Sequence, residues 1–109
     1  MTNRLRLLQL SKLLDVTRLN DADDTQQMAQ WLEQLPQLPV AVAAYCVYPS
    51  YLTQVSLVSS ESEQPSNLAT VVNFPDGNAS LEVVCQQIDE ALSAGASEID
   101  CVIPYQALM

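Results

Sequence analysis

The apolar residues of this chain follow two alternating patterns: continuous runs typical of buried strands, and helical spacings typical of amphipathic helices. A leucine-rich opening predicts a short helix leading into a strand near residues 13–16; its members are Leu5, Leu7, Leu8, Leu10, Leu13 and Leu14. Residues 20–24, Asn-Asp-Ala-Asp-Asp, then provide a helix start, with an N-cap candidate and acids for the first turn. Apolar residues follow at helical spacing from Met28 to Leu35, and Pro36 ends this helix.

The same alternation continues to the end of the chain. Residues 40–48 are continuously apolar, which is typical of a strand buried on both faces. A helix then opens at residues 49–52 and runs through Val58, and a polar loop occupies residues 59–66. The next strand spans residues 68–74, the turn 75–78 ends it, and a helix follows over residues 81–92, with Gly95 at its C-terminal cap. Residues 99–103 form the last strand.

The predicted order is therefore β-α-β-α-β-α-β, which calls for right-handed crossovers and a parallel sheet. We predict an α/β fold in which residues 1–109 form a single half-barrel domain, corresponding to the first half of a (β/α)8 TIM barrel. A small open sheet is the alternative arrangement of the same units.

One carboxylate interrupts the last apolar run. Asp100 lies within residues 99–103, and a carboxylate buried in a strand is costly unless it is paired or hydrogen-bonded. Either a structural bond or a functional role would explain it. In parallel α/β folds, function belongs at the carboxyl ends of the strands, where this sequence repeatedly has polar or reactive residues. They are Asp15, Thr17, Asn20, Cys46, Tyr48, Asn73, Asp76 and Asp100.

Charge and cysteine content limit the partners. The chain has 13 acids, four bases, no histidine and a net charge of −9, so neither a nucleic acid nor an anionic membrane is expected to bind. No apolar run approaches the roughly 18 residues that cross a bilayer, and the sequence begins without a signal-peptide pattern, so we expect a soluble cytoplasmic protein. Cys46, Cys85 and Cys101 have no metal-binding spacing, and we expect buried, reduced thiols.

Four segments together resemble deoxyribose-phosphate aldolase, in the order of that family and near its spacing. They are residues 14–20 (LDVTRLN), 43–49 (AAYCVYP), 71–78 (VVNFPDGN) and 98–105 (EIDCVIPY). The resemblance extends from Leu8 to Met109, and the second segment is most similar to the bacterial branch whose motif ends in Cys-x-Tyr-Pro.

The resemblance implies a class I aldolase that cleaves 2-deoxyribose 5-phosphate into glyceraldehyde 3-phosphate and acetaldehyde through a Schiff base, without a metal or other cofactor. Asp100 matches the aspartate that the family uses in its proton relay. Asp15 and Thr17 match residues that line the substrate pocket, and Cys46 and Asn73 match positions near it. Asn20 belongs to the first matching segment and is assigned to the same pocket.

The lysines of that chemistry are missing from this sequence. The family takes its Schiff-base lysine, a second lysine and its phosphate site from later strands, and the single lysine here, Lys12, matches none of them. We therefore expect the isolated chain to have negligible aldolase activity.

Three explanations of a half-barrel remain open. The chain is a truncated aldolase, or a self-associating structural module that forms a homodimer, including one with exchanged elements, or one chain of a split aldolase completed by a C-terminal half.

Overall fold

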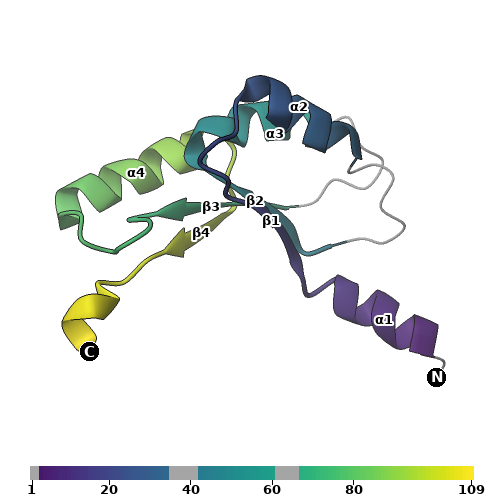
Figure 1. Ribbon diagram of the computed structural model, residues 1–109, viewed down its shortest axis with the longest axis horizontal. Helices are drawn as coiled ribbons and strands as arrows, with labels where there is room; N and C mark the ends of the chain where they lie inside the picture. Colours follow the sequence, from purple (N-terminus) through teal and green to yellow (C-terminus); the bar gives the residue numbers. More distant parts are fainter. Residues whose placement is uncertain (1–2, 35–41, 61–66) are drawn as a thin grey trace.

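The computed structural model describes residues 3–34, 42–60 and 67–109, in which helices and strands alternate (Figure 1). The elements are α1 Asn3–Ser11, β1 Asp15–Arg18, α2 Thr25–Gln34, β2 Ala44–Val47, η2 Pro49–Tyr51, α3 Leu52–Ser60, β3 Asn67–Val72, α4 Leu81–Ser93, β4 Glu98–Cys101 and η3 Tyr105–Leu108. Pro36, the first two residues of the predicted strand 40–48 and most of the predicted loop 59–66 lie outside the described residues.

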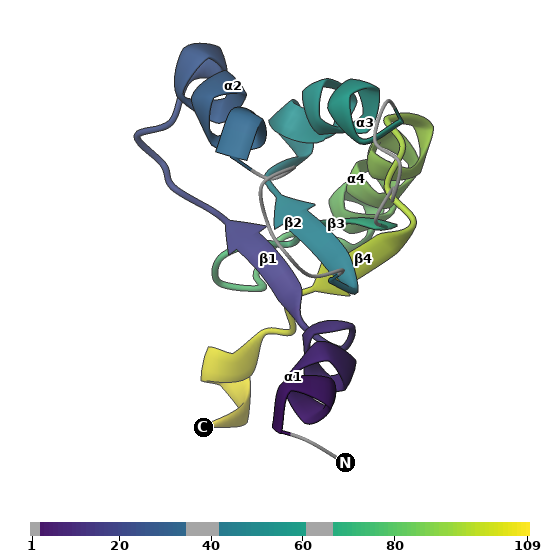
Figure 2. The same cartoon turned by 90° about the vertical axis from the view of Figure 1, so that its right-hand side faces the viewer.

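The four strands form one parallel sheet in the order β1-β2-β3-β4. Helices α2, α3 and α4 all lie on one side of this sheet, whereas α1 projects from its other side (Figures 1 and 2). Consecutive parallel strands connected by helices on one face are the repeating unit of a β/α barrel. The predicted α/β class with the architecture of a partial barrel is confirmed, and β1 and β4 are the edges of the sheet.

The main core fills the space between the sheet and these three helices. Its buried side chains come from α2, α3, α4, the strand residues that point toward them and the connection between α4 and β4: Met28, Leu32, Val47, Leu52, Val55, Leu68, Ala91 and Ala96. Thr70 is fully buried in the sheet, and its hydroxyl donates to the carbonyl oxygen of Val47 at 2.6 Å. This bond satisfies the buried hydroxyl and links β3 to β2.

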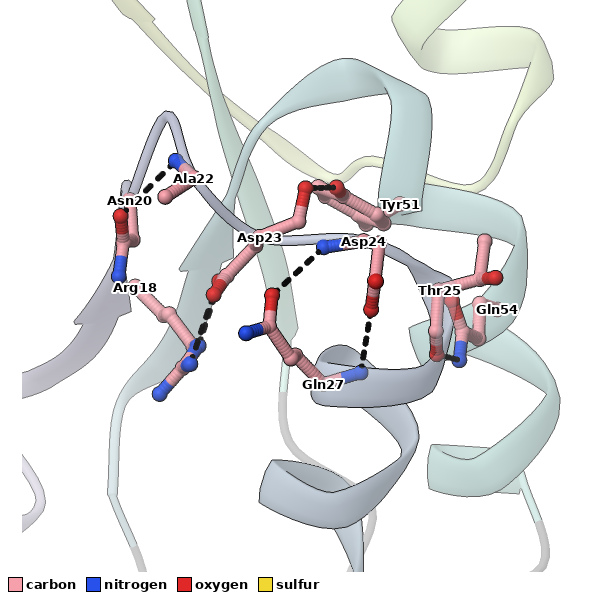
Figure 3. A network of polar contacts seen from close by, with 9 residues as sticks. All are labelled: Arg18, Asn20, Ala22, Asp23, Asp24, Thr25, Gln27, Tyr51 and Gln54. Atoms are coloured by element: carbon pink, nitrogen blue, oxygen red, sulfur yellow. Dashed lines mark hydrogen bonds and ion pairs between the residues drawn. The ribbon is translucent and has the colours of Figure 1, made fainter.

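The acids of residues 20–24 precede α2 and are absent from its first turn, which differs from the prediction. The Asp24 carboxylate accepts from the Gln27 backbone N–H at 2.8 Å, and the Gln27 side chain accepts from the Asp24 N–H at 3.1 Å. This reciprocal pair makes Asp24 the cap, so the helix begins at Thr25 (Figure 3). Asn20 instead accepts from the N–H of Ala22 within the loop.

The loop before α2 is fixed by two further contacts (Figure 3). The Arg18 guanidinium makes two hydrogen bonds to the Asp23 carboxylate, at 2.6 and 2.8 Å, and the Tyr51 hydroxyl donates to the Asp23 carbonyl oxygen. Because the hydrogen bond to Arg18 favours the charged carboxylate, it lowers the pKa of Asp23. The connection from β1 to α2 is therefore tied to η2, directly before α3.

Two burial predictions are wrong. Asp100 was expected in a buried strand, but β4 is an edge strand and Asp100 is exposed. Of the three cysteines expected to be buried, only Cys46 is, while Cys85 and Cys101 are exposed. Both errors have the same cause: β4 and one side of α4 have no further strand or helix beside them in the described residues. Cys46 instead lies in the interior strand β2, whose predicted burial is confirmed.

Asn73 connects the ends of β3 and β4. It follows β3 with a φ of 56°, in the left-handed region that asparagine tolerates better than most residues. Its amide group donates to the Val102 carbonyl at 2.8 Å and accepts from the Ala79 N–H at 2.8 Å, and its own N–H donates to the Gln87 side chain. One buried side chain thus joins β3, the loop before α4 and the residue after β4.

Gly77 lets the loop before α4 lie close to the chain after β4. Its N–H donates to the Asn73 carbonyl oxygen, its φ is 79°, and a Cβ at this position would lie 2.1 Å from the Ile103 carbonyl oxygen. Only glycine permits this approach of the loop to the chain after β4.

We expect Asn73→Ala to destabilise the protein by about 2–4 kcal/mol, because it leaves two backbone groups without partners and places alanine at a positive φ. Asn73→Gly should cost less, since glycine keeps the backbone conformation and loses only the amide bonds. Urea denaturation monitored by circular dichroism measures both changes. Equal stability of Asn73→Ala and the unsubstituted protein would contradict the structural role of this side chain.

Candidate functional site

The strand register places several of the predicted site residues on one face of the sheet. Thr17 pairs with Cys46, Cys46 with Ala69 and Ala69 with Glu98, and Val71 pairs with Asp100. Because side chains alternate along a strand, Asp15 shares this face with Thr17, and Asp100 shares it with Glu98. We call this side of the sheet, opposite α2, α3 and α4, the acid-bearing face.

The middle of the acid-bearing face differs from its margins. The interior strands contribute the buried residues Ala44, Cys46, Ala69 and Val71, against which Leu19 and Tyr48 pack. The edge strands contribute Asp15, Thr17, Glu98 and Asp100, all exposed. Small apolar side chains therefore form the floor of this face, and carboxylates accessible to solvent lie on both sides of it.

Cys46 and Asp100 make a direct polar contact across this face. The Cys46 thiol donates to Oδ2 of Asp100 over a distance of 3.8 Å, and Cys46 is 2% exposed. Burial, followed by the charge and the hydrogen bond of Asp100, raises the pKa of Cys46 to about 11. Asp15 and Glu98 add to this shift, so the thiol experiences the carboxylates of both edge strands.

The raised thiol pKa also affects stability. The fold favours the neutral thiol, so the contribution of Cys46 to stability is complete below its ordinary pKa of 9.0 and is lost as the pH rises through about 11. At neutral pH Cys46 is therefore a hydrogen-bond donor to Asp100 and a poor nucleophile.

The other two predicted pocket residues have local hydrogen bonds. Asn20 accepts from the Ala22 N–H in the loop after β1, and the Asn73 side chain holds the junction between β3 and β4. The structure thus brings Asp15, Thr17, Cys46 and Asp100 to one face, and gives Asn20 and Asn73 bonds that shape the loops around it.

A second group of side chains connects the carboxyl ends of the first three strands. The Tyr48 hydroxyl donates to the Asp21 carboxylate at 2.6 Å, which raises the pKa of Tyr48. The Tyr48 ring also meets the Phe74 ring edge to face, with centroids 5.7 Å apart. These contacts place Asp21 and Phe74 beside the predicted strand-end residue Tyr48.

Sequence reasoning did not identify Glu98 as a site residue. The sequence does indicate its position, because side chains alternate along a strand. Glu98 lies two positions before Asp100, so the two side chains share a face. The single lysine, Lys12, is exposed and lies between α1 and β1, at the amino end of the strand.

Within the described ranges, no three His, Cys, Asp or Glu side chains gather as the ligands of a metal ion would. None of the described helices is both long enough and apolar enough to cross a membrane.

Removing the charge of Asp100 should lower the pKa of Cys46. With Cys85 and Cys101 replaced by serine, ¹³C labelling of cysteine would allow NMR titration of Cys46 alone. We expect Asp100→Asn to lower the pKa of Cys46 below about 11. Glu98→Gln should lower it less, because Asp100 raises the thiol pKa more than Glu98 does. Asp76→Asn, in the loop before α4, serves as the control and should leave it unchanged. An unaltered pKa in Asp100→Asn would contradict the thiol–carboxylate contact.

Comparison with known proteins gives matches to solved structures, whereas no family model matches the chain. A candidate deoxyribose-phosphate aldolase from Coccidioides immitis is 22% identical, with a TM-score of 0.79 over 93% of this chain and 38% of its own. The aldolase QR15 is 24% identical, with a TM-score of 0.73 over 90% of this chain and 42% of its own. The tetrameric deoxyribose phosphate aldolase from Aeropyrum pernix is 23% identical, with a TM-score of 0.74 over 90% of this chain and 40% of its own.

The chain therefore spans about two fifths of the length of these aldolases. Since their strands and helices superpose on nearly all of it, the 109 residues have the fold of part of a β/α barrel.

Proposed function

We propose that residues 1–109 provide part of a cytoplasmic deoxyribose-phosphate aldolase site in which Asp100 moves protons and a lysine outside these residues forms the Schiff base. The proposed reaction cleaves 2-deoxyribose 5-phosphate into glyceraldehyde 3-phosphate and acetaldehyde, or joins these two aldehydes. No metal or other cofactor is part of the proposal.

The observation that carries the proposal is the position of Asp100 on the acid-bearing face, in contact with the Cys46 thiol. The Asp100 carboxylate is exposed, so a substrate can reach it, and the thiol holds one of its oxygens without competing as a nucleophile. Asp15 and Thr17 offer polar groups for substrate hydroxyls on β1 of the same face. The aldolase fold of the structural neighbours supports this assignment.

The proposed chemistry needs an amine close to Asp100. A neutral lysine attacks the substrate aldehyde, water leaves, and an acid-base group transfers protons to and from the imine and the enamine carbon. Lys12 is unsuited to this role because it precedes β1, at the amino end of the sheet, whereas Asp100 pairs with Val71 near the carboxyl end of β3. The amine is therefore proposed to come from further barrel strands beside β4 or from a complementing C-terminal half.

The exposed edges β1 and β4 favour a second candidate function, a structural module that associates with copies of itself. The tetrameric neighbour from Aeropyrum pernix makes an oligomer plausible for this fold. A complementing half and a second copy are thus both proposed partners. Aldolase activity is expected only with a complementing half, because a second copy brings no Schiff-base lysine.

A chimera tests the role of Asp100. Residues 1–109 would replace the matched segment of the Aeropyrum pernix aldolase, and cleavage of 2-deoxyribose 5-phosphate would be measured by a coupled assay. We expect the chimera to be active, and Asp100→Asn to reduce kcat at least about 100-fold, because it removes the proton relay.

Glu98→Gln in the same chimera is the matched control, since Glu98 is an exposed carboxylate on the same strand and face. It should change kcat by less than about threefold. Equal losses in the two variants would contradict the specific role of Asp100, and an inactive chimera would contradict the proposed site.

Borohydride trapping tests the source of the amine. The 109-residue chain incubated with acetaldehyde and sodium borohydride at neutral pH should show no more reduced adduct than its Lys12→Arg variant, as measured by mass spectrometry. A stoichiometric adduct that disappears in Lys12→Arg would show that this chain supplies its own nucleophile.

A further inference from the structure

The carboxyl end of β2 presents a tyrosine whose side chain is held in one position. Tyr48 directly follows β2 with extended backbone, at a φ of −59° and a ψ of 150°. Its hydroxyl donates to Oδ1 of Asp21 at 2.6 Å, and its ring meets Phe74 edge to face. Contacts from two different loops therefore hold Tyr48, one at the hydroxyl and one at the ring.

Tyr48 lies in the same row across the sheet as Asp100. Val47 pairs with Thr70 on β3, so the next residue, Tyr48, is level with Val71. Val71 in turn pairs with Asp100 on β4. Tyr48 also packs against the floor of the acid-bearing face, so it lies on the same side of the sheet as the Asp100 carboxylate.

Hydrogen-bond chemistry determines what the Tyr48 oxygen can still do. An ionised carboxylate has no proton to give, so Tyr48 is the donor in its bond to Asp21. A phenol has one proton and two lone pairs, so the Tyr48 oxygen is left as an acceptor only. Tyr48 is partly exposed and Asp21 is exposed, so a hydroxyl of a ligand can reach this oxygen.

The separation of Tyr48 and Asp100 suits a small hydroxylated substrate. Neighbouring strands lie about 4.8 Å apart, so the backbones at these two residues, two strands apart, are separated by roughly 10 Å. Five carbons in an extended chain span roughly 5 Å, and the two side chains extend over the remainder. One substrate molecule can therefore contact both residues.

We propose that the Tyr48 oxygen accepts a hydrogen bond from the C4 hydroxyl of 2-deoxyribose 5-phosphate, and that Asp21 is the positioning residue that directs this bond. The C4 hydroxyl is the one that the reaction leaves unchanged. C1 is the carbon that forms the imine, the C3 hydroxyl becomes the aldehyde of the product, and C5 carries the phosphate.

This inference rests on the proposed function, but it assigns Tyr48 a different kind of role from that of Asp100. Because the C4 hydroxyl takes no part in bond cleavage, its hydrogen bond is equally strong in the ground state and the transition state, and it acts on KM. Water can replace a missing hydroxyl at a partly exposed oxygen. The contact should therefore change kcat/KM about threefold to tenfold, far less than the roughly 10⁴-fold of a buried polar site.

The alternative is that Tyr48 only holds the loop after β1. Tyr51 holds the same loop from the other side of the sheet: its hydroxyl donates to the Asp23 carbonyl oxygen (Figure 3), and its ring packs against the main core. Tyr51→Phe therefore removes a tyrosine hydroxyl that fixes this loop without touching the acid-bearing face, which makes it the matched control for Tyr48→Phe.

Substrate discrimination in the chimera tests the contact. Release of acetaldehyde would be measured from 2-deoxyribose 5-phosphate and from 2,4-dideoxypentose 5-phosphate, which lacks the C4 hydroxyl. Tyr48→Phe should lower the ratio of the two kcat/KM values about threefold to tenfold, through the KM of the hydroxylated substrate. Asp21→Asn should lower this ratio too, because its amide can donate to the Tyr48 oxygen and compete with the substrate. Tyr51→Phe should leave the ratio unchanged.

NMR titration of ¹³C-labelled tyrosines in the 109-residue chain tests the Tyr48–Asp21 pair without any activity. The hydrogen bond to Asp21 raises the pKa of Tyr48, so Asp21→Asn should lower it, with the Tyr48 signal identified by its loss in Tyr48→Phe. An unchanged pKa would overturn the role of Asp21.

The kinetic outcomes separate this inference from the proposed function. An active chimera in which Tyr48→Phe keeps the substrate ratio overturns the contact and leaves the proposed function standing. An equal fall of the ratio in Tyr51→Phe also overturns the contact, because it assigns Tyr48 to the loop alone. An inactive unsubstituted chimera overturns the proposed function and this inference with it.

Discussion

The junction between β3 and β4 is the constraint on which the arrangement of the described residues most depends. Asn73 accepts a positive φ and uses its amide to join the loop before α4 to the carbonyl after β4. Gly77 brings that loop against Ile103, closer than any side chain would allow. Since β4 lies at the sheet edge with a neighbour on one side only, this junction adds to the ladder with β3 in fixing where Asp100 lies.

Most of the element order could be predicted from the sequence because it depends on local periodicity. Residues 81–92 show helical spacing and Gly95, with a φ of 110°, closes that helix as expected. The start of α2 was missed because four of the residues 20–24 could cap a helix, and only the reciprocal bonds of Asp24 and Gln27 select one. The exposure of Asp100 was missed because periodicity does not reveal whether a strand is interior or at an edge.

The candidate site could be predicted as a set of strand-end residues but not as a geometry. The register and the period of two along each strand account for Asp15, Thr17, Cys46 and Asp100 reaching one face, although Asp15 begins β1 and so lies at its amino end, not at its carboxyl end as predicted. The same rule could not distinguish them from Asn20 and Asn73, whose side chains bond to nearby backbone. Short polar side chains at strand ends serve turns as readily as ligands, and only their hydrogen bonds separate the two uses.

The charge of the acid-bearing face restricts the chemistry that it can support. Arg18 is paired with Asp23, and the other three bases belong to residues 1–14, before β1. Burial, followed by the charges of three carboxylates, raises the pKa of the Cys46 thiol, and the field of the same carboxylates would favour the charged ammonium form of a nearby lysine. A Schiff-base amine must be neutral to attack an aldehyde, so a lysine placed beside Asp100 needs a second cation near it to offset these carboxylates. An aldolase built on this face therefore requires an amine and at least one further cation, both from outside the 109 residues.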